Sequence, residues 1–463
     1  MLLARAAMLR DRSRRPGGHA LRCARRRPRD GRRPDGDAMR LALGPAGDLV
    51  RGRIFYGWYI ALAGAFTSFF TFGVVGFGFG VFIEPIREET GWSLAAISVG
   101  FSLRSFEHGL LAPVTGALVD RLGARRMAIT GVLIVGVGLL LFSQARVLWV
   151  YYLASLVVGS GESLGSSTAY SASLMRWFDR KRGQALGLLA SARGAGYFMV
   201  PVLAVLIAAF GWRSTLVVAA LVIVSVGLPL SFVLRNRPEA YGYRPDGAAA
   251  PATPAASASD SLGDGMTVAQ ALRTPAFYLL GAATAIGGAT QISWIVHQVP
   301  HLQNVGFTLQ GAALITGAYG LFQVPLRFIC GWFGDIIGRR RLYVIAYLLQ
   351  SLGMLIFAWL SPDRMWLLPA YFLTFPFAHA AWVAMFMTLI ADYFGTRYFA
   401  TIRGLTSTMM MPLGFATPII AGWTFDELGS YRLVFTCYAL ITLSGAVLLL
   451  LIRRPTWAQL ASR

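Results

Sequence analysis

The chain has 463 residues, of which 56% are hydrophobic and 14% are charged. Soluble globular domains carry about 25% charged residues, so this composition excludes an ordinary soluble domain and a largely disordered chain. Three cysteines are too few for the disulfide framework of a small secreted protein. A net charge of +21 is typical of two remaining classes, a nucleic-acid-binding protein and a membrane protein with basic loops.

Residues 1–53 form an arginine-rich segment without apolar periodicity. They hold 15 arginines and five aspartates, a net charge of +10, and we expect a disordered tail. Such a tail suits RNA or anionic lipid headgroups. The alternative is that residues 1–38 are not translated and that Met39 is the start, because 41 arginines against one lysine indicate GC-rich DNA. The segment has no apolar core of a signal peptide.

From residue 54 onward, apolar runs recur that are close to the ~20 residues a helix needs to cross a bilayer. Without water in the hydrocarbon, such runs must be helices. We therefore predict an all-α integral membrane protein. The twelve predicted transmembrane helices lie at about 57–83, 95–118, 127–145, 148–175, 184–210, 213–234, 276–299, 310–334, 342–360, 365–391, 404–425 and 432–452.

A segment rich in Ala, Pro and Ser at 235–275 separates six predicted spans from the other six. We interpret it as a flexible cytoplasmic linker between a half at 54–234 and a half at 276–453, with a cytoplasmic tail at 454–463. The connections on the side of the termini hold 19 basic residues, and those on the opposite side hold five. The positive-inside rule places the first set and both termini in the cytoplasm, so the charge requires no nucleic acid.

The two halves carry the same marker residues at a constant offset of 215 positions. Pro85, Gly91, Gly116, Asp120 and Gly123 correspond to Pro300, Gly306, Gly331, Asp335 and Gly338. A parallel repeat of six plus six helices is typical of the major facilitator fold, with two pseudo-symmetric halves and a substrate site between them near mid-membrane.

The chain resembles the major facilitator superfamily in the two stretches GALVDRLGARR (116–126) and GWFGDIIGRRR (331–341). Short segments such as Tyr56-Gly57-Trp58-Tyr59 resemble the bacterial branch of monocarboxylate and oxalate/formate antiporter-like transporters. The resemblance covers about residues 54–453. It implies a cytoplasmic gate that ties the halves together. The gate residues are Gly116, Asp120, Arg121, Gly123, Arg125, Arg126, Gly331, Asp335, Gly338, Arg339 and Arg340. The alternative is a pair of tight turns whose basic residues serve topology.

Two arginines within the predicted spans are candidates for substrate binding. A charge at membrane depth costs at least ~2.5 kcal/mol, so each requires a reason. Arg327 lies about 12 Å and Arg193 about 15 Å from the cytoplasmic markers by helical rise. The resemblance implies that Arg327 binds a substrate carboxylate. Oxalate-specific relatives add a lysine in the eleventh helix, where this chain reads Met409–Gly414, so Arg193 is the candidate second cation. The alternatives are a structural ion pair for Arg327 and a snorkelling or interdomain role for Arg193.

Four other polar residues within the spans are candidates for proton coupling or buried ion pairing. Arg104 and Glu107 lie three residues apart on one helix face, and we expect them to pair. Glu162 is the first candidate for proton coupling, because burial raises the pKa of a carboxyl group. An ion pair with an arginine is the alternative for Glu162. His379 lies near the symmetry-related position and is either a pathway residue or a hydrogen-bonding histidine.

His297 and His301 have ligand-like spacing without a nearby acidic partner, so we predict interfacial packing and no metal site. No phosphate-binding loop is present, and we expect no cofactor and no catalytic residues. The sequence predicts a monomeric secondary transporter of the bacterial inner membrane. It would move a small organic anion, first of all a monocarboxylate, by alternating access with proton symport or anion exchange, surrounded by lipid. The alternatives are an efflux carrier for amphipathic compounds and a transport-inactive sensor.

Overall fold

The computed structural model describes residues 55–165, 168–247, 265–395 and 398–453, which belong to one unit, Pro45–Arg463. The predicted tail 1–53 (with residues 1–38), residues 248–264 of the linker and the tail 454–463 lie outside the described residues.

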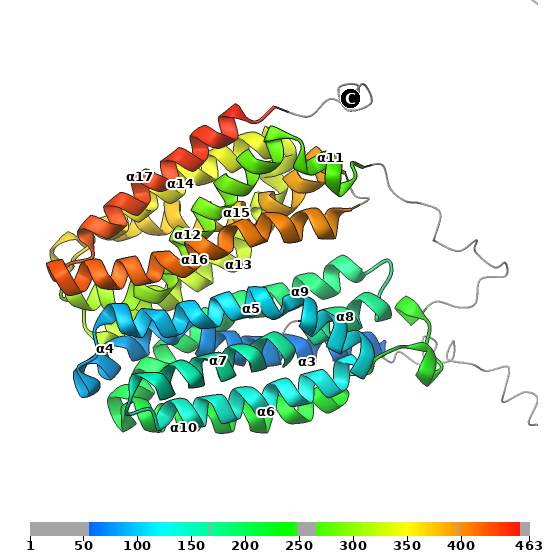
Figure 1. Ribbon diagram of the computed structural model, residues 1–463, viewed down its shortest axis with the longest axis horizontal. Helices are drawn as coiled ribbons and strands as arrows, with labels where there is room; N and C mark the ends of the chain where they lie inside the picture. Colours follow the sequence, from blue (N-terminus) through cyan, green and yellow to red (C-terminus); the bar gives the residue numbers. More distant parts are fainter. Residues whose placement is uncertain (1–54, 166–167, 248–264, 396–397, 454–463) are drawn as a thin grey trace, which may run out of the picture. The chain divides into compact units, whose positions relative to one another are not determined.

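The main helices follow the chain in the order α3 (Tyr56–Thr71), the π-helix η1 (Phe72–Phe77), α4 (Phe79–Thr90), α5 (Leu94–Leu122), α6 (Ala124–Ser143), α7 (Leu148–Gly165), α8 (Thr168–Trp177), α9 (Arg182–Ala195), η2 (Gly196–Phe198), α10 (Met199–Val233), α11 (Val268–Leu272), α12 (Pro275–Asn304), α13 (Leu309–Ile337), α14 (Arg339–Ala358), α15 (Leu367–Phe394), α16 (Phe399–Leu428) and α17 (Arg432–Leu451). Helical segments lie in all twelve predicted spans (Figure 1). Eight helices in the described part are long and apolar enough to cross a membrane, so the count of twelve stays a prediction.

Side-chain caps begin several of these helices. Ser93 accepts a hydrogen bond from the backbone N–H of Ala96 at the start of α5. Thr274 and Thr308 cap α12 and α13 in the same way. These residues satisfy backbone donors that have no partner within the helix. The motif glycines Gly123 and Gly338 have φ values of 88° and 94°, which favour glycine and give tight turns after α5 and α13.

Helix breaks differ from the sequence prediction at two places. The first predicted span is interrupted by the π-helix η1. The fifth and sixth predicted spans run on as α9, η2 and α10, and Gly211 (φ 75°, ψ 164°) separates them. After this break, Arg213 donates hydrogen bonds to the Ser143 carbonyl oxygen and to Glu89 Oε1, the latter at 2.8 Å. The hydrogen bond from Arg213 holds the pKa of the Glu89 carboxyl below its ordinary value.

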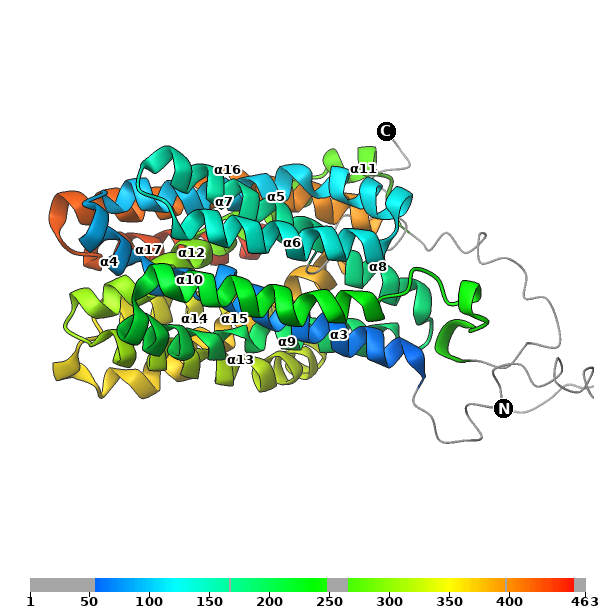
Figure 2. The ribbon, with the colours of Figure 1, turned by 90° about the horizontal axis from the view of Figure 1, so that it is seen from below.

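The helices form two groups, which we call the N-terminal half (55–247) and the C-terminal half (265–453) (Figure 1). Within the first, α3 packs against α9 and α10 (Figure 2), and α6 against α7. Within the second, α14 packs against α15 and α17. Between the halves, α5 packs against α16, and α10 against α13.

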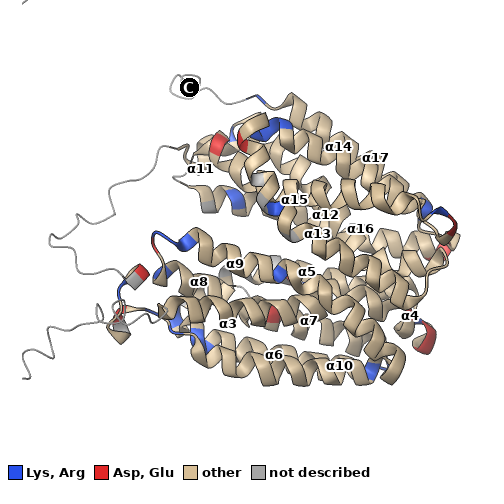
Figure 3. Ribbon diagram, turned by 180° about the vertical axis from the view of Figure 1, so that it is seen from behind, with Lys and Arg blue, Asp and Glu red and all other residues tan. Residues whose placement is uncertain are grey.

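One end of the bundle joins the halves. We call the helix ends near Gly91 and Asp426 the Asp426 end, and the opposite ends the Asp335 end. Both oxygens of Asp426 accept backbone hydrogen bonds of 2.9 Å, from Leu94 and Ala95 in the first turn of α5. Asp426 belongs to the C-terminal half and α5 to the N-terminal half. The charged residues gather mostly at the two ends of the helices (Figure 3).

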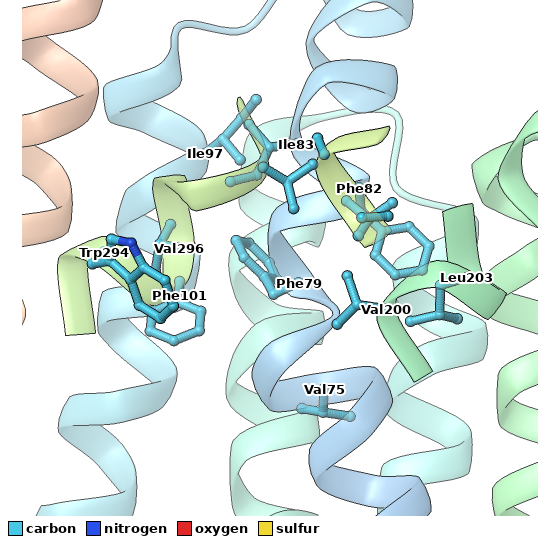
Figure 4. Close-up of a cluster of buried hydrophobic side chains, with 14 of the residues drawn as sticks. Val75, Phe79, Phe82, Ile83, Ile97, Phe101, Val200, Leu203, Trp294 and Val296 are labelled. Atoms are coloured by element: carbon cyan, nitrogen blue, oxygen red, sulfur yellow. The ribbon is translucent and has the colours of Figure 1, made fainter. Parts of the chain in front are cut away.

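Three buried hydrophobic clusters follow the same division. One contains residues of both halves, among them Phe79, Phe82 and Ile97 beside Trp294 and Val296 (Figure 4). The other two lie toward the Asp335 end, one within each half. Among the described residues, the halves therefore share a core toward the Asp426 end and have separate cores toward the Asp335 end.

The described flanks of the predicted linker fold onto the helices. Both side-chain oxygens of Asp246 accept hydrogen bonds from backbone N–H groups of residues 179–181, just before α9. On the other flank, Thr267 and Gln270 form a capping box at the start of α11. Composition alone did not indicate this local order.

Candidate functional site

Arg327 of α13 reaches across to the N-terminal half. Its Nη1 donates a hydrogen bond of 3.2 Å to the backbone oxygen of Ala190 on α9. A Cβ atom placed on Gly194, one turn further along α9, would lie 3.3 Å from the same Nη1. The guanidinium group therefore lies against the backbone of α9 between Ala190 and Gly194. On its own helix, Nε lies 3.4 Å from Gln323 Oε1.

Arg193 lies on the same helix segment. Its Cζ is 3.5 Å from the centre of the Phe72 ring, at the start of η1. Cation–π contact stabilises a guanidinium group without neutralising it. Within the part of the chain that the structure describes, no carboxylate forms an ion pair with Arg193 or Arg327. The two arginines proposed from the sequence are thus brought to one stretch of α9, residues 190–194, from different halves.

A polar chain extends from Arg327 into the C-terminal half. Gln323 Nε2 donates to Tyr319 Oη at 3.1 Å and to the Pro376 backbone oxygen at 2.9 Å. Tyr319 Oη lies 2.7 Å from His379 Nδ1. Gln291 Nε2 of α12 lies 3.4 Å from both Tyr319 Oη and His379 Nδ1. His379 is therefore linked to Arg327 through Tyr319 and Gln323.

Tyr197 of η2 faces this chain from the N-terminal half. Its ring stacks on Phe77 at 3.8 Å and contacts Tyr319 edge-on at 5.2 Å. The buried Tyr197 Oη, Gln291 Oε1 and Trp294 Nε1 have no hydrogen-bond partner among the described residues. Buried polar atoms normally have one, so these atoms retain capacity for a polar ligand.

The sequence analysis did not single out Tyr197, Gln291, Tyr319 or Gln323. A signal was present on α13, where Tyr319, Gln323 and Arg327 recur every four residues and so share one helix face. Tyr197 and Gln291 carried no such signal, because single polar residues in long apolar helices commonly only bond across helices.

Arg104 and Glu162 form a separate buried group toward the Asp426 end. Arg104 Nε lies 4.0 Å from Glu162 Oε2 on α7, and both side chains are about nine-tenths buried. Glu107, the expected partner of Arg104, instead accepts a hydrogen bond from Ser160. The structure therefore directs Arg104 toward another helix, where Glu162 supplies the nearby charge.

His297 and His301 of α12 each contact a backbone oxygen. His297 Nε2 contacts Ser98 Oγ of the other half at 3.2 Å and the Pro418 oxygen at 2.9 Å. His301 Nε2 bonds to the Phe357 oxygen at 2.9 Å. No group of three potential metal ligands occurs among residues 55–165, 168–247, 265–395 and 398–453.

The gate residues whose contacts the structure describes bond within their own half. Arg339 pairs with Asp392 at 2.6 Å and with Asp335 at 3.4 Å. Arg340 donates to the Leu449 and Leu450 oxygens, and the backbone N–H of Arg125 donates to Asn236. A Cβ atom on Gly116 would meet nothing within 4 Å. The side chain of Asp120 and the surroundings of Gly331 lie outside what the structure describes.

A bundle of long apolar helices, with two arginines placed where the two halves meet, is typical of a multi-pass membrane transporter. The family model described as Major Facilitator Superfamily matches residues 61–417 and, in a second alignment, 306–462. The chain belongs to the Major Facilitator Superfamily, as its two motifs predicted, and the relatives that it matches are transporters rather than enzymes.

Three relatives illustrate its position in the family. Mouse (Mus musculus) monocarboxylate transporter 11 is 26% identical over 84% of this chain and 86% of its own length. The Bacillus subtilis protein named "Uncharacterized MFS-type transporter YcxA" is 23% identical over 84% and 94%. The Cupriavidus necator protein named "Probable sulfoacetate transporter SauU" is 26% identical over 78% and 85%.

Solved structures support the fold. A bacterial homolog of the human lysosomal transporter Spinster, in an inward-facing occupied conformation, gives a TM-score of 0.70 at 16% identity, covering 86% of this chain and 97% of the other. The nucleoside transporter NupG gives 0.68 at 14% identity, covering 84% and 99%. The major facilitator fold predicted from the repeat is confirmed.

Proposed function

We propose that this protein is a secondary active transporter that moves a small organic anion, first of all a monocarboxylate, by alternating access. The observation that carries the proposal is the convergence of Arg327 and Arg193 on α9, with no carboxylate in ion-pair contact with either among the described residues. A guanidinium fork binds a carboxylate through two parallel hydrogen bonds, so an anion would supply the missing negative charge.

The polar surroundings agree with a small anion. Tyr197 and Gln291 offer buried unpartnered atoms beside Tyr319 of the polar chain. The aromatic rings of Phe72 and Phe77 support the site from the N-terminal half. The names of the relatives add monocarboxylates and sulfoacetate as substrate classes to test. Proton symport or anion exchange would supply the driving force.

The remaining features of the proposal follow from the sequence. The bias of basic residues supports a cytoplasmic Asp335 end with both termini on that side, in a bacterial inner membrane. The two six-helix halves at 54–234 and 276–453 complete one pathway, which supports a monomer. The residues of the two motifs would form the cytoplasmic gate when that end closes.

The proposal is tested with purified protein in liposomes, using counterflow of labelled mono- and dicarboxylates beside lipophilic cations. We expect carboxylates to exchange, and Arg327→Ala to bind them about 10- to 100-fold more weakly, since a charge-assisted hydrogen bond is lost. Arg327→Lys should restore binding only partly, because an ammonium group lacks the fork. Arg341→Ala, an exposed arginine of α14, is the matched control. Exchange of lipophilic cations alone, or full binding by Arg327→Ala, would overturn the proposal.

A further inference from the structure

The π-helix η1 interrupts the first predicted span, and residues at both of its ends contact the proposed site. The ring of its first residue, Phe72, makes a cation–π contact with the Arg193 guanidinium group. The ring of its last residue, Phe77, stacks on Tyr197. A π-helix shifts the hydrogen-bond pattern from i+4 to i+5 and occurs mainly at functional sites. The geometry of η1 therefore sets the positions of two side chains at the site.

Arg104 of α5 also binds this element. Its Nη1 donates a hydrogen bond of 2.5 Å to the backbone oxygen of Val75, inside η1. The Arg104 guanidinium also lies over the Phe101 ring at 4.5 Å, and Glu162 is 4.0 Å away. A buried cation is costly unless it is paired and hydrogen-bonded, and Arg104 meets both conditions.

Arg104 is separated from the anion pathway by its surroundings. The cavity that it lines, together with Val74, Val75, Phe79 and Phe101, has a volume of about 20 Å³. Such a cavity has room for about one water molecule, not for a carboxylate substrate. Arg104 thus contacts the π-helix and its counterion rather than the substrate.

We propose that Arg104 is a positioning residue for anion binding, which acts by holding the Val75 carbonyl group and thereby the π-helix that supports Arg193 and Tyr197. Glu162 is the counterion of Arg104. This inference rests on the proposed anion transport for its effect on binding, but the contact with η1 is testable without substrate.

The first test measures hydrogen–deuterium exchange of peptides that cover residues 72–80 in full-length protein without substrate. Arg104→Met should accelerate exchange in this segment about tenfold, because the π-helix loses its side-chain support. Arg104→Lys, which keeps a charge beside Glu162, should give an intermediate rate. Arg146→Met, an exposed arginine in the α6–α7 connection, is the control. Wild-type exchange at 72–80 in either folded Arg104 variant would overturn the inference.

The second test measures carboxylate binding by the folded fraction of each variant. Arg104→Met should raise Kd about tenfold, since misplacement of binding groups weakens affinity, and Arg104→Lys should partly rescue it. A purely structural role would lower Tm and leave Kd unchanged. If wild-type protein binds no carboxylate while exchange responds as expected, the proposed function fails and the Arg104 contact stands.

Discussion

Position 194 sets how closely Arg327 can approach α9. Gly194 is buried, and a Cβ atom there would lie 3.3 Å from Nη1 and 3.5 Å from Cζ of Arg327. This spacing is tight, so any side chain at position 194 moves the guanidinium group away from its present place. At Gly187, two turns earlier on α9, such an atom would have nothing within 4 Å.

We therefore predict that Gly194→Ala weakens carboxylate binding about three- to tenfold, because Arg327, the proposed carboxylate ligand, moves by a fraction of an ångström. Stability should not fall, since alanine favours a helix interior over glycine by about 1 kcal/mol. Calorimetric titration and a thermal melt measure the two effects. Gly187→Ala is the matched control and should gain stability without a change in Kd. Unchanged affinity in Gly194→Ala would contradict the placement of Arg327.

At this scale the sequence indicated charged groups better than neutral ones. Arg193 and Arg327 stood out because a charge in an apolar helix is expensive. Gln291 and Tyr197 did not, because amides and phenols are tolerated in such helices for many reasons. Partner choice was also hidden: Arg104 and Glu107 share a helix face, but only the packing of α5 on α7 brings Glu162 to Arg104.

At the scale of elements, hydropathy located the apolar runs but not the breaks within them. The segment at 72–80 is rich in glycine and apolar throughout, so nothing in its hydropathy distinguishes a π-helix from an α-helix. The π-helix packs closely on η2, since a Cβ atom on Gly196 would lie 2.9 Å from the Gly73 nitrogen. Such contacts join residues far apart in the chain, so the sequence of one segment does not predict them.

Gly211 is the second break, and here the backbone alone explains the residue. Its φ of 75° and ψ of 164° lie in a region that only glycine adopts readily, while a Cβ atom at this position would meet nothing within 4 Å. Gly211→Ala should therefore destabilise the protein by about 1–3 kcal/mol through backbone strain alone. Chemical unfolding in mixed micelles measures it, with Gly187→Ala as a change of opposite sign. A Gly211→Ala variant as stable as wild type would refute the strain argument.

At the scale of the whole molecule, the two ends are held differently. The halves share one buried cluster toward the Asp426 end, whereas the clusters toward the Asp335 end are separate in the described residues. Gly422 of α16 approaches α5 closely, since a Cβ there would lie 2.7 Å from the Ala95 nitrogen. This arrangement is the one expected when the Asp426 end is closed, and no sequence pattern indicates which end a transporter closes.

Asp426 contributes the charged part of this closure. Its carboxylate accepts two backbone hydrogen bonds at the N-terminus of α5, where free N–H groups and the helix dipole favour negative charge. Because Asp426 and α5 belong to different halves, these bonds exist only while this end is closed. Under alternating access, opening must break both bonds and expose the shared core.

Asp426→Ala should therefore shift the conformational equilibrium toward an open Asp426 end by about 1–2 kcal/mol, or roughly 5- to 30-fold in population. Spin labels at Glu88→Cys and Gln310→Cys, exposed positions on the two halves at this end, report the opening as a longer distance in a background without native cysteines. Glu427→Ala removes the same charge one residue away, from a side chain that is exposed like Asp426 but has no described hydrogen bond to α5, and should leave the distribution unchanged. A shift of equal size in both variants would assign the effect to local charge, and no shift in Asp426→Ala would show that the apolar core alone holds this end closed.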